Sequence, residues 1–503
     1  PPPPPPRRDP LTLDLDGDGI ETTGVTGTVL FDHNCDGIRT GSGWVGADDG
    51  LLVLDRNGNG QIDNGSELFG ADTLLANGQK ASDGFAALRD LDGNGDNVFD
   101  AQDARFADVR VWRDLAQNGV SQAGELFALE TLDITAINLN AANETVDLGN
   151  GNLQTASATY VRANGTTGEA AGVALGETAA NLELAQNPFF RQFTDIVALT
   201  GEANLLPQMQ GSGMVRDLRE AASLSPELAA AASAYASQTT RAGQMALLDG
   251  LITAWAGTAD MATSVEQAAN LGYKLAYLDQ GQPVSQYGIL LLSWEEGYLT
   301  VFTPQDAAAL ELLKTQQAET ARRVGVLEHF NGRSFFETID AGGVTTGQGW
   351  RLEVMDLPVN PPVSYVHVSL LSGQGSLLDA SYQSLKDSVY AGLLMQTRLK
   401  PYADAIALQI DAGGLHVDFT GVTAMLAALR ETDATNALID MVELHQAAGS
   451  TFYSLGWDAL PLLRSWINDA AGDAALRDVL AELSVKYDPS DLVGTDRADI
   501  ILG

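Results

Sequence analysis

The chain has 503 residues, 45% of them hydrophobic, so it is long enough for two or three domains with substantial cores. Lysine and arginine total 28 against 66 aspartate and glutamate, a formal net charge of −38. This charge argues against nucleic acid and anionic membranes as partners and favours cations, although acids also keep a chain soluble. Cys35 is the only cysteine, which excludes an internal disulfide and a cysteine-ligated zinc site.

Residues 1–9 predict a proline-rich linker that ends at a labile bond. Pro1 to Pro6 favour a stiff polyproline II spacer, which we expect to hold the Asp9–Pro10 bond exposed and away from regular structure. The Asp9 carboxyl can attack its own backbone carbonyl through a five-membered ring while Pro10 leaves as a secondary amine. We find no signal peptide and no apolar run long enough for a membrane span, so we expect a segment of a longer polypeptide.

Residues 10–186 are rich in glycine, aspartate and asparagine, which predicts short strands and helices connected by loops. One of these loops follows the twelve-residue EF-hand scheme, with Gly119 at the turn and Ala116 as a departure at position three. Its predicted calcium ligands are Asp114, Asn118, the Val120 carbonyl, Gln122 and Glu125.

A second loop precedes it and starts 22 residues earlier, at Asp92. Asn97 replaces the turn glycine, a substitution that costs little because asparagine tolerates a left-handed backbone. We expect the two loops to share a helix, as paired calcium sites do. The predicted ligands of this loop are Asp92, Asn94, Asp96, the Val98 carbonyl, Asp100 and Asp103.

Three less regular acidic loops come earlier in the chain. In the best formed of them, Glu67 falls at position thirteen rather than twelve, which predicts a site of altered geometry. Any one of these loops is equally well explained as a polar turn, but so many within about 115 residues indicate calcium binding. Their predicted ligands are Asp14, Asp16 and Asp18; Asp32, Asn34 and Asp36; and Asp55, Asn57, Asn59, Asp63 and Glu67.

Residues 187–486 predict a mainly helical domain, so the expected fold class is α+β. The expected helices lie at 215–235, 238–255, 304–324, 378–396 and 422–447, with a small β insertion at 350–355 and 365–370. The five histidines of the chain are scattered, and we find no known catalytic motif. We therefore expect a structural or partner-binding role for this domain. Residues 487–503 predict the start of an RTX-like calcium repeat, and the nearby Asp488–Pro489 bond is a linker by position.

Together these motifs resemble the large RTX proteins of Gram-negative bacteria of the iron-regulated Frp type. Within that family the chain is similar to the self-processing module and the helical region that follows it. The residues that carry the resemblance are Asp9 to Thr22, Gly43 to Gly50, Asn57 to Gly70, and Val111 to Phe127.

The resemblance implies a secreted protein, exported by type I secretion, whose module folds around Ca²⁺ and cleaves itself once. Asp9 would be the nucleophile and new C-terminus, and Pro10 the new N-terminus. The aspartic anhydride could then be captured by a lysine amine as an isopeptide cross-link. Lys80 is the only lysine in the module, so an acceptor in another molecule or domain is favoured. The alternative is a non-catalytic calcium-binding structural or adhesin segment, in which Asp9–Pro10 is an ordinary linker bond.

Overall fold

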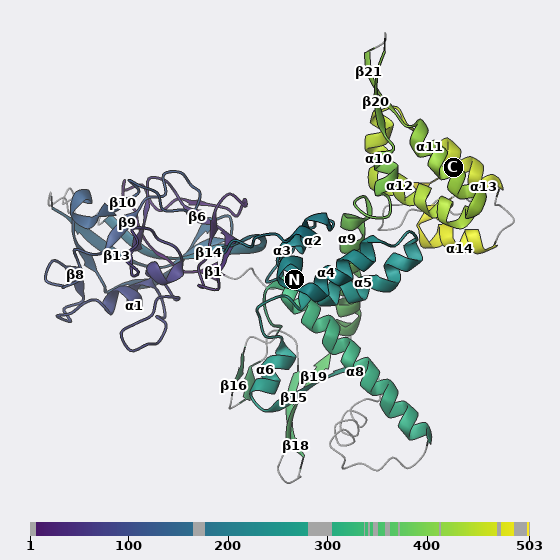
Figure 1. The fold of residues 1–503 in the computed structure, drawn as a ribbon. Coiled ribbons are helices and arrows are strands. Elements are labelled where there is room, and N and C mark those ends of the chain that lie inside the picture. Colours follow the sequence, from purple (N-terminus) through teal and green to yellow (C-terminus); the bar gives the residue numbers. More distant parts are fainter. Residues whose placement is uncertain are drawn as a thin grey trace. The chain divides into compact units, whose positions relative to one another are not determined.

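The computed structural model describes residues 7–163, 177–279, 304–335, 338–340, 343–345, 351–357, 363–370, 373–411, 414–469, 474–486 and 500–501. The chain forms two compact units, Pro1–Ile196 and Val197–Gly503, which are described separately (Figure 1). The boundary that we expected after residue 186 falls inside strand β14, Glu177–Phe193, and the first unit continues to Ile196. The polyproline spacer, the Asp488–Pro489 bond and most of the RTX-like turn lie outside the described residues.

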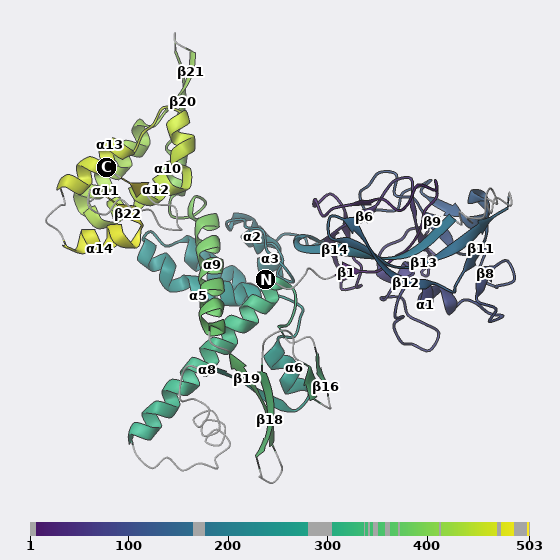
Figure 2. The same ribbon diagram turned by 180° about the vertical axis from the view of Figure 1, so that it is seen from behind.

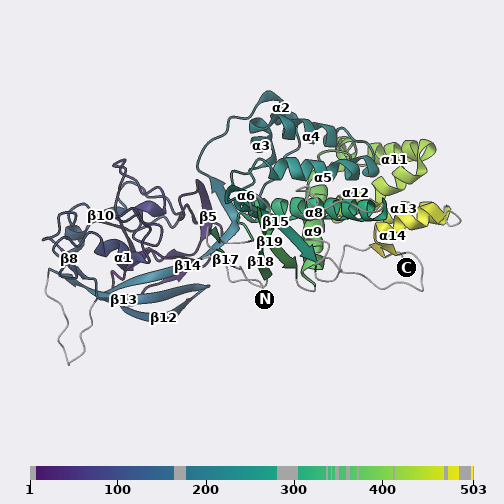
Figure 3. The ribbon, with the colours of Figure 1, turned by 90° about the horizontal axis from the view of Figure 1, so that it is seen from below.

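The N-terminal unit is built on one large curled sheet, in which all strand pairs are antiparallel. Strand β14 is its organising element, because it pairs along its length with β13, β2, β1 and β5. Figure 3 shows the long strands β12, β13 and β14 side by side. The other strands are β1 Arg7–Arg8, β2 Leu11–Leu13, β4 Leu30–Phe31, β5 Ile38–Ser42, β7 Gly50–Val53, β8 Val98–Asp100, β9 Arg110–Trp112, β10 Leu126–Ala128, β11 Ile134–Asn138, β12 Ala142–Gly149 and β13 Asn152–Arg162, and a separate pair is formed by β3 Thr22–Thr23 and β6 Trp44–Val45.

Both faces of this sheet are covered, since successive residues of β7 enter different hydrophobic cores. Leu52 packs in one core with Phe85 of helix α1, Gly84–Arg89. Leu51 packs in the other core with Trp44 and Trp112, whose rings meet edge to face at 5.4 Å. The short strands of this unit are therefore stabilised by two layers of buried side chains as well as by the sheet.

The C-terminal unit is mainly helical, as the sequence predicted. Two of the expected helices are each broken into a pair by a residue whose side chain caps the second helix. Ser225 accepts a hydrogen bond from the amide of Leu228, and Asp433 accepts one from the amide of Asn436. The described helices are α2 Gly201–Leu205, α3 Leu218–Leu224, α4 Pro226–Ala236, α5 Arg241–Ala256, α6 Ser264–Asn270, α8 Pro304–Asn331, α9 Gln374–Leu394, α10 Lys400–Asp404, α11 Thr420–Thr432, α12 Ala434–Ser454, α13 Leu460–Asp469 and α14 Ala474–Glu482.

The predicted β insertion is confirmed. β18 Arg351–Leu357 and β19 Val363–Leu370 form an antiparallel hairpin. β15 Tyr273–Asp279 adds to it in parallel, a third strand that the sequence did not predict. Smaller strand pairs are β16 Thr338–Asp340 with β17 Gly343–Thr345, β20 Ala407–Asp411 with β21 Gly414–Asp418, and β22 Val485–Lys486 with β23 Ile500–Ile501.

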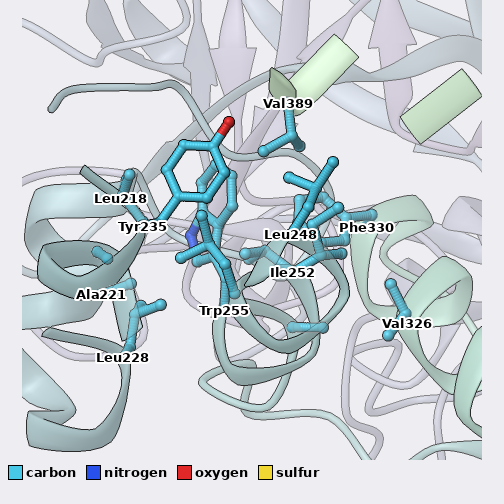
Figure 4. Packing of buried hydrophobic residues seen from close by; sticks show 14 of the residues in the cluster. Leu218, Ala221, Leu228, Tyr235, Leu248, Ile252, Trp255, Val326, Phe330 and Val389 are labelled. Atoms are coloured by element: carbon cyan, nitrogen blue, oxygen red, sulfur yellow. The ribbon is translucent and has the colours of Figure 1, made fainter. Parts of the chain in front are cut away.

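Helices α4, α5, α8 and α9 enclose a core around Tyr235 and Trp255 (Figures 2 and 4). The Trp255 ring meets Phe330 edge to face at 5.3 Å, and its indole nitrogen donates to the carbonyl of Arg216 at 2.8 Å. Trp255 is thus a core residue. Within the described part of the chain, none of the helices has the length and apolar character needed to cross a membrane.

A buried cation lies between helices of this unit. The Arg398 guanidinium is ion-paired with Asp440 and Glu443 of α12, and Tyr390 and Tyr402 donate to the same two carboxylates. All three charged residues are at most 5% exposed. Charges buried this deeply are stable only as a complete set, because removal of one partner leaves the others uncompensated.

We therefore expect Arg398→Ala to lower the free energy of unfolding of the helical unit by about 3–5 kcal/mol. The control is Lys400→Ala, which breaks an exposed ion pair with Asp404 and should cost at most about 1 kcal/mol. Urea unfolding followed by far-UV circular dichroism at fixed calcium measures both values. Equal losses of unfolding free energy in the two variants would contradict a special contribution of the buried Arg398 ion pairs to stability.

Candidate functional site

The Asp9–Pro10 bond lies within the sheet, between β1 and β2. Arg8 pairs with Leu184 of β14 on one side of the bond. On the other side, the Pro10 carbonyl accepts from the amide of Leu182 at 3.0 Å. Pro10 is buried and Asp9 is half-buried, so our expectation of an exposed bond away from regular structure was wrong. The physical reason is that β14 continues past the end of β2 and offers its edge to the residues before Asp9.

The segment Gly70–Ala71 holds Asp9 from a second direction. The amide of Ala71 donates to Asp9 Oδ1 at 2.8 Å and so fixes the orientation of the carboxyl. Gly70 lies against the backbone carbonyl of Asp9, where a Cβ atom would come within 2.3 Å of the carbonyl oxygen. Gly70 ends the run from Asn57 to Gly70 that carries the family resemblance, but the sequence did not predict its contact with Asp9.

Burial raises the pKa of the Asp9 carboxyl to about 6, and the negative charges of Asp83 and Asp72 add to the rise. The hydrogen bond from Ala71 opposes it, because it stabilises the ionised form. At pH 7 roughly a tenth of the carboxyl is therefore protonated.

The five acidic loops share one backbone arrangement. We number them loop 1 (14–19), loop 2 (32–37), loop 3 (55–67), loop 4 (92–103) and loop 5 (114–125). In every loop the first aspartate accepts a hydrogen bond from the amide five residues later, and the residue that donates has a positive φ. These pairs are Gly19 to Asp14 (3.2 Å), Gly37 to Asp32 (3.0 Å), Gly60 to Asp55 (2.8 Å), Asn97 to Asp92 (2.9 Å) and Gly119 to Asp114 (2.7 Å).

A second left-handed residue stands at position four of every loop, where the sequence patterns made no prediction. Glycine occupies it in loops 1, 3 and 4. In loops 2 and 5 it is Cys35 (φ 63°) and Gln117 (φ 52°), residue types for which this conformation is unusual. Cys35 is thus a turn residue of loop 2, and its thiol donates to Asn64 Oδ1 at 3.2 Å.

Each of loops 3, 4 and 5 is closed by its last acid, which accepts amides from both ends of the loop. Asp103 binds the amides of Gly93 and Asp100, and Glu125 binds those of Ala116 and Gln122. Glu67 binds those of Arg56 and Asp63, at 3.1 and 2.8 Å. Although Glu67 stands at position thirteen, it therefore holds the same place as the closing acids at position twelve.

Most of the remaining predicted ligands form hydrogen bonds within their own loops. Val98 and Val120 donate their amides to the side chains of Asp96 and Asn118, at 2.8 and 2.9 Å. In loops 2, 3 and 4 the side-chain amides of Asn34, Asn57, Asn59 and Asn94 donate to Asp36, Asp63, Asp63 and Asp96, respectively. In loop 1, Asp14, Asp16 and Asp18 each bring one carboxylate oxygen within 4.8 Å of the others.

The loops do not pair as we expected. Residues 104–113, all described, contain strand β9 and no helix, so loops 4 and 5 do not share one. Instead loop 5 contacts loop 3, because the amide of Ile62 donates to Ser121 Oγ at 2.7 Å. Both residues stand at position eight of their loops. Loop 2 joins the same group through the amide of Gly65, which donates to the Asp32 carbonyl at 2.8 Å.

The burial of the loop acids provides a test of whether a cation fits. Six predicted ligands at the ends of the loops are buried carboxylates, between 0% and 5% exposed. Within the described residues, none of them forms an ion pair with a lysine or arginine. Burial raises the pKa of Asp32 and of Asp114, as expected for carboxylates without a countercharge. These all-oxygen sets fit a hard cation such as Ca²⁺; the six residues are Asp14, Asp32, Glu67, Asp103, Asp114 and Glu125.

Comparison with known proteins connects this unit to a named domain. Residues 11–176 match the SPM domain, and the match begins at the residue after Pro10. Over 447 residues, 87% of this chain, the sequence is 36% identical to the iron-regulated protein FrpA of Neisseria meningitidis serogroup C. The chain is a relative of FrpA. It spans about a third of that protein, 35% of its length, and the relation fits a segment of an RTX protein.

If calcium neutralises the buried carboxylates of the loops, its removal should unfold the N-terminal unit and leave the helical unit folded. We expect peptides from residues 11–128 to lose protection from hydrogen exchange when EDTA replaces calcium, because the buried carboxylates then repel one another. Peptides from α5 and α12 should stay protected. Hydrogen exchange read by mass spectrometry checks this, with Mg²⁺ as the control cation; unchanged protection of residues 11–128 in EDTA would contradict it.

Proposed function

We propose that the N-terminal unit is a calcium-dependent self-processing module that cleaves its own Asp9–Pro10 bond. One observation carries the proposal. The Asp9 carboxyl is bound by Ala71, only four residues after Glu67, the closing acid of loop 3. A change in loop 3 is therefore transmitted over a few covalent bonds to the group that would react.

The segment between Glu67 and Ala71 is held firmly enough for such transmission. The amide of Leu54 donates to the Glu67 carbonyl at 2.8 Å, and the amide of Leu11 donates to the Phe69 carbonyl at 2.8 Å. Thr73 Oγ1 accepts from the amide of Gly70 and donates to the Leu68 carbonyl. Loop 3, the Gly70 turn and β2 are thus joined by backbone bonds around the scissile peptide.

In the proposed reaction a carboxyl oxygen of Asp9 attacks the backbone carbonyl carbon of the same residue. The carbon–nitrogen bond to Pro10 breaks, the proline nitrogen takes up a proton, and Asp9 becomes a five-membered cyclic anhydride. The bond from Ala71 orients the attacking carboxyl, and the bond from Leu182 holds the proline that leaves. Orientation of this kind is worth several orders of magnitude in rate.

The proton can come from Asp9 itself. Burial raises the pKa of its carboxyl to about 6, so an acid form persists at neutral pH. Such a carboxylic acid can give up its proton as it attacks, and the leaving nitrogen can accept it. No second acid is then required, although Asp83 and Asp72 lie close enough to raise the Asp9 pKa.

Calcium, held by the predicted ligands of the five loops, would neutralise their carboxylates and so let the module fold. The chain's own residues perform every other task. Cleavage would therefore follow folding of the whole unit.

The anhydride can be opened by water or by a lysine amine. Water leaves a free aspartate at the new C-terminus, whereas an amine of another protein gives an isopeptide cross-link and releases a carboxylate. The relation to FrpA and the RTX-like motifs support a secreted protein as the setting, with export by type I secretion.

A calcium-stabilised structural or adhesin segment is the second candidate. The same buried carboxylates support it, because a cation would neutralise them whether or not a bond is cleaved. It differs from the first candidate in one respect, which is that Asp9 and Pro10 stay joined.

The decisive experiment is the intact mass of the purified chain before and after incubation with millimolar calcium. We expect loss of the peptide from Pro1 to Asp9 in calcium, none in EDTA, and none in Asp9→Ala. The control is Asp488→Ala, which alters the chain's other Asp–Pro bond and should cleave like the wild type. An unchanged mass in calcium, with folding demonstrated, would favour the structural segment instead.

Gly70→Ala tests the positioning of the reacting carbonyl. A Cβ atom at Gly70 would displace the Asp9 carbonyl, and a misplacement of about 1 Å can slow a reaction roughly 100-fold. We expect a loss of that order in the cleavage rate at saturating calcium, with calcium affinity retained. Gly250→Ala is the control, because nothing lies within 4 Å of its added Cβ and its backbone is not left-handed. If Gly70→Ala cleaves at the wild-type rate, Gly70 does not position the reacting carbonyl of Asp9.

A further inference from the structure

One buried carboxylate of the N-terminal unit belongs to none of the predicted loops. Six of its buried acids are first or last residues of those loops. The seventh is Asp49, which is 0% exposed. Like the other six, it forms no ion pair with a lysine or arginine among the described residues. A carboxylate that is fully buried without a countercharge requires a reason.

Asp49 lies against loop 1, more than 30 residues away in the sequence. Its Oδ1 accepts from the amide of Leu15 at 3.3 Å, and its Oδ2 accepts from the amide of Glu21 at 3.1 Å. These amides belong to the second and eighth residues counted from Asp14. The two oxygens of one carboxylate thus bridge the start of loop 1 and the residues just after it.

The closing acids of loops 3 and 4 make a similar bridge. In loop 4, Asp103 accepts the amides of the second and ninth residues, and in loop 3, Glu67 does the same. Loop 1 has no acid at position twelve or thirteen, where Val25 and Thr26 stand. Asp49 therefore occupies the place of the closing acid in a loop whose own sequence does not supply one.

We propose that Asp49 is the closing ligand of the cation bound by Asp14, Asp16 and Asp18, so that this site is assembled from two distant segments of the chain. The inference rests on the proposed calcium binding and adds a residue to it. Asp14, Asp16 and Asp18 bring carboxylate oxygens within 4.8 Å of one another, and such a set of oxygen donors suits a divalent hard cation.

The position of Asp49 links this site to the sheet. The next residue, Gly50, begins β7 and pairs with Leu13 of β2, the strand that follows Pro10. A Cβ at Gly50 would come within 2.2 Å of Val111, so the backbone approaches closely here. A cation shared by Asp14 and Asp49 would therefore connect the end of β2 with the start of β7.

The test is calcium binding measured by isothermal titration calorimetry on the full chain. Asp9→Ala serves as the background, so that cleavage does not interfere. We expect Asp49→Asn to lose one bound ion, or to bind it at least 10-fold more weakly. Asp14→Asn should lose the same ion, and the double variant should lose one ion rather than two. The matched control is Asp48→Asn, an exposed neighbour that should bind as the background does.

Unchanged binding by Asp49→Asn, an equal loss in Asp48→Asn, or the loss of two ions in the double variant would each overturn the inference. If Asp49→Asn does not fold in calcium, ¹³C NMR of the aspartate carboxyls in the background chain replaces it. The Asp49 and Asp14 signals should then shift together during the titration, and an unshifted Asp49 signal would overturn the inference. A background chain that binds no calcium at all would contradict the proposed function instead.

Discussion

The constraint on which the N-terminal unit depends is the burial of seven carboxylates without a lysine or arginine partner among its described residues. Each buried ion costs several kcal/mol when it is uncompensated, whereas a whole domain is stable by only about 5–15 kcal/mol. We propose that bound cations offset this cost and so stabilise the folded sheet and its two cores.

This constraint explains how a peptide bond at one edge of the sheet could be controlled from loops elsewhere. Loop 3 contacts loop 5 through Ser121 and loop 2 through Gly65, so these three loops form one group. From loop 3 the chain runs directly to Gly70 and Ala71, which contact both functional groups of Asp9. The local acidic cluster of loop 1 is one part of this arrangement, and the path from Glu67 to Ala71 covers only four residues.

Much of this could be predicted from sequence because it depends on local spacing. The first aspartate, the turn residue and the closing acid of loops 4 and 5 repeat at fixed intervals, and helical periodicity marked most of the C-terminal unit. The rest depends on contacts between distant segments, which spacing does not encode. The sheet brings distant segments together. This produces the contact of Asp49 with loop 1, the contact between loops 3 and 5, and the hydrogen bond from Ala71 to Asp9. Gln117 and Cys35 occupy left-handed turn positions, but glutamine and cysteine are not residue types that usually mark such turns in a sequence.

The shortness of β1 has a consequence for the direction of the proposed reaction. Of the described residues before Asp9, Arg7 and Arg8 pair with β14, and the chain continues from them through Asp9 into β2. Once that connection is cut, the same two residues would have to remain bound as a separate molecule, against a large gain in translational and rotational entropy. So short a strand is too small to resist this gain. The upstream portion would diffuse away, and peptide bond re-formation would be suppressed by dilution without any further input of chemical energy.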